Sequence, residues 1–287
     1  MSSLQVLTPK NNTELAEALK QATPKSKILG GGTDLVILLN KDEIEPDLII
    51  DMTANKELNY IKEEDGDIYI GAITTITEIH DSELINEKAR CLAKACEKFG
   101  STQIRNKATI GGNIANASPA GDTLPALKAL DAEVSVINSK GEARFLPLGD
   151  VLAGPNKNSL NVDEAVIGVK FSAHAKPWIS TFAKLGTRTA VTISRISLAV
   201  NVVYDEATNT INDAKIALGA VGKAAFRAAK LEEELKGKVV NKELRAKFAE
   251  KLSEVIQESI PGRASLPYKK EAIKGVAYQA FEDLFSM

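Results

Sequence analysis

Residues 28–35 read Ile28-Leu29-Gly30-Gly31-Gly32-Thr33-Asp34-Leu35, and this stretch decides how the first part of the chain folds. Lys27-Ile28-Leu29 predicts a short strand, and Leu35–Leu39 predicts a short helix that Thr33 or Asp34 caps. Three successive glycines let consecutive backbone N–H groups point to one side, because no Cβ interferes. Such a loop before a helix is suited to a phosphate or diphosphate, and a tight turn that binds nothing is the alternative.

This glycine loop matches neither of the common phosphate-binding fingerprints. Leu35 stands where the dinucleotide-binding fingerprint requires its last glycine. No Gly-Lys-Ser or Gly-Lys-Thr follows, as it would in a P-loop. The anion-binding interpretation therefore depends on a second motif.

A second glycine motif, Thr109-Ile110-Gly111-Gly112-Asn113-Ile114-Ala115-Asn116, lies in the polar stretch 101–123, for which we expect irregular structure. Asn113 and Asn116 can donate to a phosphate or accept from sugar hydroxyls, and Asp122 can accept from a hydroxyl. A polar loop held together by asparagine side chains is the alternative. Long irregular loops in compact domains are usually functional, and two glycine motifs about 80 residues apart suggest one diphosphate ligand held by both.

A third segment, Phe182-Ala183-Lys184-Leu185-Gly186-Thr187-Arg188, places two cations four positions apart on a strand that runs into a turn. Taken alone, Lys184 and Arg188 are interpreted as solvated surface charges.

The rest of the chain shows the periodicity of short strands and amphipathic helices. Strands are predicted at residues 48–50, 60–61, 68–70, 133–137, 143–146, 165–171, 196–204 and 211–218, with turns at Asp65-Gly66 and Ser139-Lys140-Gly141. Helices are predicted at residues 10–21 (capped by Asn12 or Thr13), 84–99, 224–235, 242–258 and 270–285. The pattern indicates an α+β fold whose second domain begins near His174–Pro177.

Composition excludes several classes of protein. The length of 287 residues suggests about two domains, and 36 basic against 38 acidic residues argue against a broad nucleic-acid surface. The longest apolar run, Leu35–Leu39, is too short to span a membrane, and the N-terminus lacks a signal sequence, so we expect a cytoplasmic protein. Two cysteines, Cys91 and Cys96, and two isolated histidines predict no metal site or iron–sulfur cluster on this chain.

In the order and spacing of these three segments, the sequence resembles the FAD-binding medium subunits of molybdenum hydroxylases. These subunits belong to the xanthine dehydrogenase–carbon monoxide dehydrogenase family. The resemblance extends over essentially the whole chain, including Ala217–Gly222 and Arg227. It implies a PCMH-type FAD-binding domain at residues 1–175, with two α/β subdomains of about 1–57 and 58–175. A C-terminal domain of antiparallel sheet with helices follows at residues 176–287.

The resemblance also implies the residues that bind FAD. In this sequence they are Ile28, Leu29, Gly30, Gly31, Gly32, Thr33, Asp34 and Leu35 in the first loop, Thr109, Gly111, Gly112, Asn113 and Asn116 in the second, and Phe99, Asp122, Val166, Ile167 and Lys184 elsewhere. No acidic residue follows Lys184 within Thr189–Ile193, unlike in some relatives. No catalytic side chain and no metal ligand is expected, because hydride transfer needs no general base.

By the same resemblance, the protein is an oxidoreductase subunit that holds FAD noncovalently. Electrons would arrive from [2Fe–2S] clusters on a small partner subunit, originate at a large molybdopterin-binding subunit, and leave to NAD or another acceptor. Lys184 or Arg188 would stabilise the negative charge of reduced flavin. A self-sufficient FAD oxidase and a nucleotide-binding module without redox activity are the alternatives.

Overall fold

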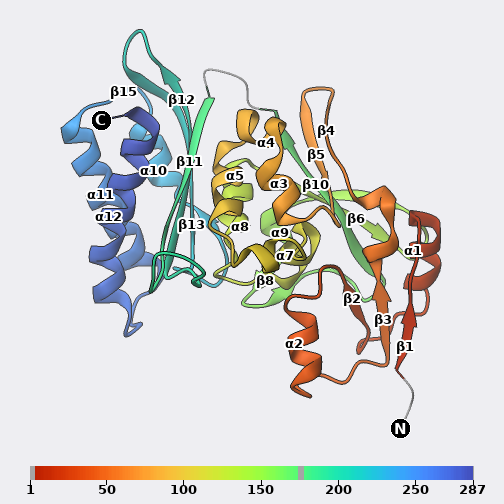
Figure 1. Cartoon of the computed structure of the whole chain (residues 1–287). Helices are drawn as coiled ribbons and strands as arrows, with labels where there is room; N and C mark the ends of the chain where they lie inside the picture. Colours follow the sequence, from red (N-terminus) through yellow and green to blue (C-terminus); the bar gives the residue numbers. More distant parts are fainter. Residues whose placement is uncertain (1–3, 174–177, 287) are drawn as a thin grey trace. The chain divides into compact units, whose positions relative to one another are not determined.

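The computed structural model describes residues 4–173 and 178–286, and Figure 1 shows its elements. The chain passes repeatedly between two compact units. The first unit comprises Met1–Ile79, Thr102–Ala117 and Ala132–Ser172, and the second comprises His80–Ser101, Ser118–Asp131 and Ala173–Met287. The domain boundary predicted at His174–Pro177 lies outside the described residues.

A three-stranded parallel sheet opens the first unit, with the order β1-β3-β2. Its elements are β1 (Gln5–Leu7), α1 (Asn12–Leu19), β2 (Lys27–Leu29), α2 (Leu35–Asn40) and β3 (Leu48–Asp51). This confirms the predicted order of helix, strand, glycine turn, helix and strand, although β1 was not predicted. The predicted cap of α1 is wrong by one or two residues, because the side chain of Asn11 accepts the hydrogen bond from Glu14 N.

A five-stranded antiparallel sheet completes the first unit, with the order β4-β5-β10-β6-β7. Its strands are β4 (Ile61–Glu64), β5 (Asp67–Gly71), β6 (Glu133–Asn138), β7 (Ala143–Pro147) and β10 (Glu164–Ser172). All five lie where strands were predicted. The Asp65-Gly66 turn is also confirmed, since both residues have positive φ, as a tight hairpin turn requires.

The connections add shorter elements. They are η1 (Met52–Ala54), η2 (Lys56–Leu58), α3 (Ile76–Asp81), α6 (Thr102–Arg105), α7 (Ile110–Asn116), α9 (Leu148–Val151), β8 (Leu152–Gly154) and β9 (Lys157–Asn158).

Two predictions for residues 84–123 are wrong. The helix predicted at residues 84–99 is two helices, α4 (Glu83–Lys88) and α5 (Arg90–Glu97), because Ala89 leaves the helical conformation with φ −143° and ψ 51°. The stretch 101–123 is also largely helical, since α6 and α7 lie within it and α8 (Thr123–Ala129) begins at its end.

The second unit is built on an antiparallel sheet with the order β11-β12-β13-β14, and β15 pairs with β13. Its strands are β11 (Trp178–Leu185), β12 (Ile196–Asp205), β13 (Thr210–Gly219), β14 (Phe226–Arg227) and β15 (Lys238–Val239). Helices α10 (Ala229–Leu235), α11 (Lys242–Ser259) and α12 (Leu266–Phe285) lie where three C-terminal helices were predicted, but α10 begins five residues later than predicted, because residues 226–227 form β14. Figure 1 shows α11 and α12 on one face of this sheet and α5 and α8 on the other.

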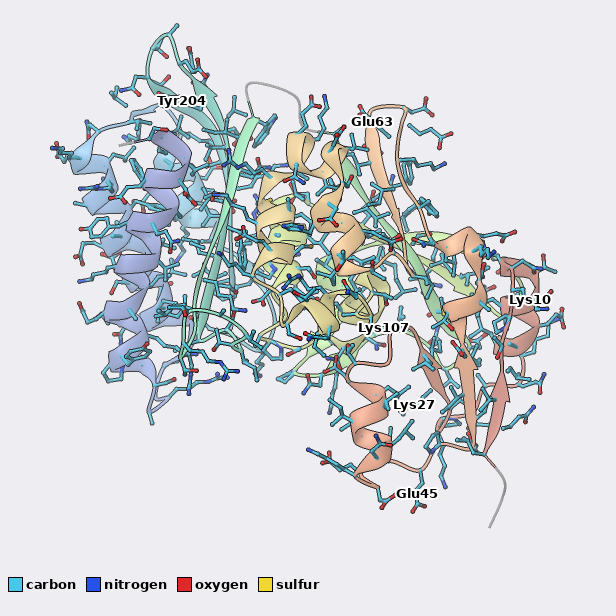
Figure 2. All side chains as sticks on the ribbon, viewed as in Figure 1. Lys10, Lys27, Glu45, Glu63, Lys107 and Tyr204 are labelled. Carbon is cyan, nitrogen blue, oxygen red and sulfur yellow. The ribbon has the colours of Figure 1, made fainter. Side chains whose placement is uncertain are left out.

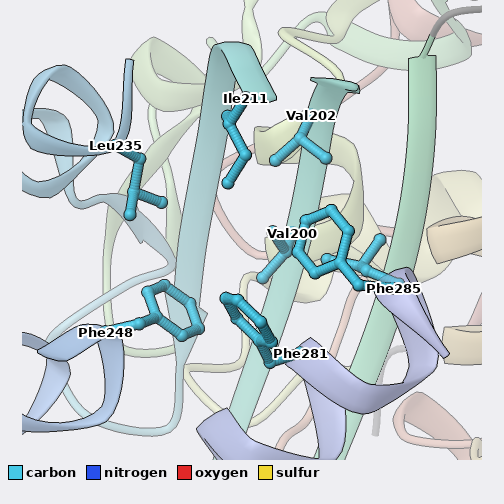
Figure 3. Close-up of a pocket in the computed structure, with 8 residues that line it drawn as sticks. Val200, Val202, Ile211, Leu235, Phe248, Phe281 and Phe285 are labelled. Carbon is cyan, nitrogen blue, oxygen red and sulfur yellow. The ribbon is translucent and has the colours of Figure 1, made fainter. Parts of the chain in front are cut away.

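The core of the second unit is apolar and tightly packed. Val200 and Val202 on β12 face Phe248 on α11 and Phe281 on α12, and all four are at most 2 % exposed. Figure 3 shows that these side chains line a small apolar cavity of about 10 Å³, which is about the room of one water molecule. This packing fixes the strands that carry the charged residues described below.

Gly275, in the middle of α12, gives a prediction for the stability of this unit. A Cβ at this position meets no other atom within 4 Å, and its φ is not positive. Gly275→Ala is therefore expected to raise the free energy of unfolding by about 0.5–1 kcal/mol, because alanine loses less backbone entropy in a helix. Urea denaturation of the full chain checks this, and a destabilised variant would contradict the open space seen at this position.

Candidate functional site

The first glycine loop exposes a row of backbone N–H groups. Within the described chain, the N–H groups of Gly31, Gly32, Thr33 and Asp34 form no hydrogen bond. Gly32 has φ +73°, a conformation that favours glycine. Asp34 precedes α2 as predicted, but its side chain makes no capping hydrogen bond. The loop therefore keeps its donors available for an anion.

The second glycine motif is the first turn of α7 rather than an irregular loop. Thr109 caps this helix, and its Oγ1 accepts from Gly112 N at 3.2 Å. The N–H groups of Ile110, Gly111 and Asn113 donate to the carbonyls of Thr74, Ala72 and Thr109. This motif is therefore not a second row of free N–H groups.

The two glycine motifs lie against each other within the first unit. A Cβ on Gly30 would lie 2.7 Å from Thr109 Oγ1, and the Cα of Gly112 is 3.9 Å from the same point. A Cβ on Gly31 would overlap the carbonyl of Lys107, which Figure 2 labels in the segment before α7. Gly112 is exposed, and its missing side chain leaves bare backbone beside the first loop. The absence of side chains at Gly30 and Gly31 thus permits the two glycine motifs to approach closely.

Ile167, one of the two apolar residues predicted to lie near the ligand, is linked to the second motif through Ala72 by main-chain hydrogen bonds. Ala72 N donates to Ile167 O at 3.0 Å, and Gly111 N donates to Ala72 O at 3.0 Å. Val166 and Ile167 lie at an irregularity of β10, where the register with β6 shifts between Val166 and Gly168. Val166 is buried, and Ile167 is partly exposed.

In the second unit, Asp122 and Lys184 form a buried ion pair. Lys184 Nζ lies 2.6 Å from Asp122 Oδ2, and their side chains are 5 % and 8 % exposed. The ammonium also donates to Lys98 O at 3.1 Å, and Ser194 Oγ donates to Asp122 Oδ1 at 2.5 Å. The interpretation of Lys184 as a solvated surface charge is therefore wrong, because β11 carries it into the interior.

Burial dominates the electrostatics of this pair. Desolvation raises the pKa of Asp122 above its usual value, and the attraction of Lys184 and the hydrogen bond from Ser194 oppose that rise. Removing Lys184 would leave a buried carboxylate with one hydroxyl partner. Ser194 was not predicted, because no motif marks a hydroxyl that lies 72 residues from its partner.

The remaining predicted residues lie in different surroundings. The guanidinium of Arg188 is exposed and donates to Val191 O from Nε at 2.7 Å. Asn113 is buried and Asn116 is partly exposed, both on α7. Phe99 is partly exposed and follows α5 in the second unit.

Among the described residues, no three His, Cys, Asp or Glu side chains are grouped so that they could hold a metal ion. None of the helices in that part of the chain has both the length and the apolar character that a membrane span needs.

Comparison with known protein families gives two matches that together extend over most of the chain. Residues 2–171 match the FAD binding domain in molybdopterin dehydrogenase, and residues 181–284 match the CO dehydrogenase flavoprotein C-terminal domain. The chain belongs to the FAD-binding subunits of the molybdopterin dehydrogenases. As a member of this xanthine dehydrogenase family, it is an oxidoreductase subunit, and both glycine motifs lie in its FAD-binding domain.

Two relatives are similar over nearly their full length. The chain is 34% identical to the nicotinate dehydrogenase FAD-subunit of Eubacterium barkeri, with 99% of this chain and 97% of the relative covered. It is 30% identical to the glyceraldehyde dehydrogenase medium chain of Sulfolobus acidocaldarius, with 94% and 95% covered. These relatives are named for different substrates, so similarity assigns the family but no substrate.

Solved structures support the same fold. The structure resembles a chain of carbon monoxide dehydrogenase from Hydrogenophaga pseudoflava with a TM-score of 0.89, 24% identity, and coverage of 99% and 97%. It resembles a chain of quinoline 2-oxidoreductase from Pseudomonas putida 86 with a TM-score of 0.88, 22% identity, and coverage of 98% and 96%. The predicted α+β architecture is thereby confirmed.

Proposed function

We propose that this chain binds FAD noncovalently, with the diphosphate held by the N–H groups of Gly31–Asp34. The observation that carries the proposal is the contact between two glycine motifs, one of which has free N–H groups, inside the segment that matches an FAD-binding domain. Consecutive N–H groups without side chains suit a diphosphate. The exposed backbone of Gly112 leaves room beside that loop.

The other residues implied by the resemblance are proposed as FAD contacts on that basis. They are Ile28, Leu29, Gly30, Leu35, Phe99, Thr109, Gly111, Asn113, Asn116, Asp122, Val166, Ile167 and Lys184. Lys184 would act as part of a neutral pair with Asp122 rather than as a free cation.

Noncovalent attachment is supported by the chemistry of the cysteines. Burial raises the pKa of Cys91 to about 12, so its thiolate is not available at neutral pH. Cys96, also on α5, is buried as well.

FAD, when bound, supplies the redox chemistry. The protein's own residues bind the diphosphate and fix the orientation of the cofactor. We propose that the chain is the medium chain of a complex with a small iron–sulfur subunit and a large molybdopterin-binding subunit, and that NAD or another acceptor takes the electrons. The medium-chain relatives of similar length support this assembly.

Purification of the full chain tests this function. We expect an equimolar amount of FAD that is released intact when the protein is denatured, because no covalent bond holds it. Addition of NADH without oxygen is expected to bleach the flavin absorbance if NAD is the acceptor. A protein that neither retains nor takes up FAD would overturn the proposal, and oxidation of a small substrate without partners would indicate a self-sufficient oxidase.

A further inference from the structure

Three segments of the second unit contain basic residues and no acidic residue. Residues 186–204, 216–226 and 259–270 contain no Asp or Glu. They hold six basic residues, which are Arg188, Arg195, Lys223, Arg263, Lys269 and Lys270. The chain as a whole has more acidic than basic residues, so this local excess does not follow from composition.

Lys269 is the buried member of this group. Lys269 is 8 % exposed, and its Nζ donates to the carbonyl of Ala220 at 2.6 Å. An ammonium group has three donors, and Lys269 forms no ion pair with any described carboxylate. A buried charge without a counter-ion is unfavourable, so an anion at this position would stabilise the fold.

Arg195 and Arg263 lie on the segments that surround Lys269. Arg195 precedes Ser197, which pairs with Gly219 at the end of β13, and Ala220 follows directly. Arg263 ends the turn before α12, where its carbonyl accepts from Leu266 N. Figure 1 shows the β11–β12 connection and the start of α12 at the same end of the sheet. Both guanidinium groups are exposed, and neither has a partner among the described residues.

The charges of these three side chains act on one another. Burial lowers the pKa of Lys269, and repulsion from Arg263 and Arg195 lowers it further. Three cations held close enough to repel, one of them buried, are expected where an anion completes the site.

We propose that Lys269, Arg195 and Arg263 form a binding site for a phosphate group. Two exposed guanidinium groups can donate paired hydrogen bonds to phosphate oxygens, and Lys269 supplies a charge that its hydrogen bond to Ala220 O holds in place. The start of α12, a helix of 20 residues, adds positive potential. The phosphate is either a free anion or part of the dinucleotide that accepts electrons, and only the second source rests on the proposed function.

Arg195 directly follows Ser194, which holds Asp122 of the buried ion pair. A dinucleotide acceptor carries a diphosphate that needs cations, and this chain offers them next to residues implied to contact FAD.

Calorimetric titration of the full chain with inorganic phosphate tests the site, with NAD⁺ as a second titrant. Arg195→Gln and Arg263→Gln remove exposed cations and leave the buried Lys269 in place. Each is expected to weaken phosphate binding by at least about tenfold, since a charge-assisted hydrogen bond is lost. Lys247→Gln, an exposed lysine on α11 without an ion pair to a described residue, is the matched control and is expected to bind as the unaltered chain does.

Saturable phosphate binding that both arginine variants lose and the control keeps would support the site. Binding of NAD⁺ with the same dependence on Arg195 and Arg263 identifies the dinucleotide as the source, and phosphate binding without NAD⁺ binding identifies the free anion. No saturable binding, or equal binding by all variants, overturns the site. Flavin absorbance recorded in the same samples tests the proposed function separately. Loss of flavin with retained phosphate binding would contradict the proposed function and leave the phosphate site supported.

Discussion

Gly31→Ala is expected to abolish retention of FAD, although it adds a single carbon atom. The new Cβ would overlap the carbonyl of Lys107, which belongs to the main chain and cannot rotate away. The glycine loop and the segment before α7 would have to separate, and the N–H groups of Gly31–Asp34 would move from their present positions. We expect FAD affinity to fall more than about 100-fold, measured as flavin absorbance per chain after gel filtration.

Gly112→Val separates a binding defect from a folding defect. Gly112 is exposed, and a Cβ there approaches only Thr109 Oγ1, at 2.9 Å. This variant is expected to lose FAD, because the valine side chain enters the space beside the glycine loop, while its apoprotein unfolds at a higher temperature than that of Gly31→Ala. Gly275→Ala, which meets no atom, is the control that should keep FAD. Normal flavin content in both Gly31→Ala and Gly112→Val would remove the two motifs from the FAD site.

The elements that could be predicted from sequence are those specified by local signals. The Asp65-Gly66 turn and the antiparallel strand pair at residues 196–204 and 211–218 depend on neighbours in the chain, and the structure has them. The three-residue strand β1 has no such signal, because its pairing with β3 requires a partner more than 40 residues away.

The helix α7 was missed because its composition is typical of a loop. Two glycines and two asparagines in seven residues lower helix propensity. The signal was nevertheless present, since Thr109 is a good cap, and Ile110 and Ile114, four residues apart, are both buried. The break at Ala89 had no such signal, because Ile85, Ala89 and Leu92 all remain buried across it.

For the candidate site, sequence reasoning found both glycine motifs and expected them to act together, and the structure brings them into contact. It could not reveal that the N–H groups of α7 are already used, because their acceptors, Thr74 and Ala72, lie more than 30 residues away. It also could not show that Lys184 is paired with Asp122, 62 residues earlier. Contacts of this kind depend on how distant segments pack.

Lys184→Met is expected to destabilise the second unit by about 3–5 kcal/mol at neutral pH, because it leaves Asp122 as a buried charge without a cation. Urea denaturation measures this loss. Burial already raises the pKa of Asp122 in the folded chain, and loss of Lys184 raises it further, so ionisation of Asp122 then opposes folding. That cost is present above the folded-state pKa and disappears as the pH falls below the unfolded value. The defect should therefore shrink in acid.

The double variant Asp122→Asn, Lys184→Met tests whether the unpaired charge is the cause. It removes both charges at once, so it is expected to be more stable than Lys184→Met at neutral pH and to show little of its pH dependence. Lys20→Met, which breaks an exposed pair with Glu17, is the matched control and should change the free energy of unfolding little. A single variant as stable as the unaltered chain at pH 7 would mean that water or rearranged side chains reach Asp122. Lys184 would then have to be retained for its effect on a ligand, since stability would no longer explain a buried cation on β11.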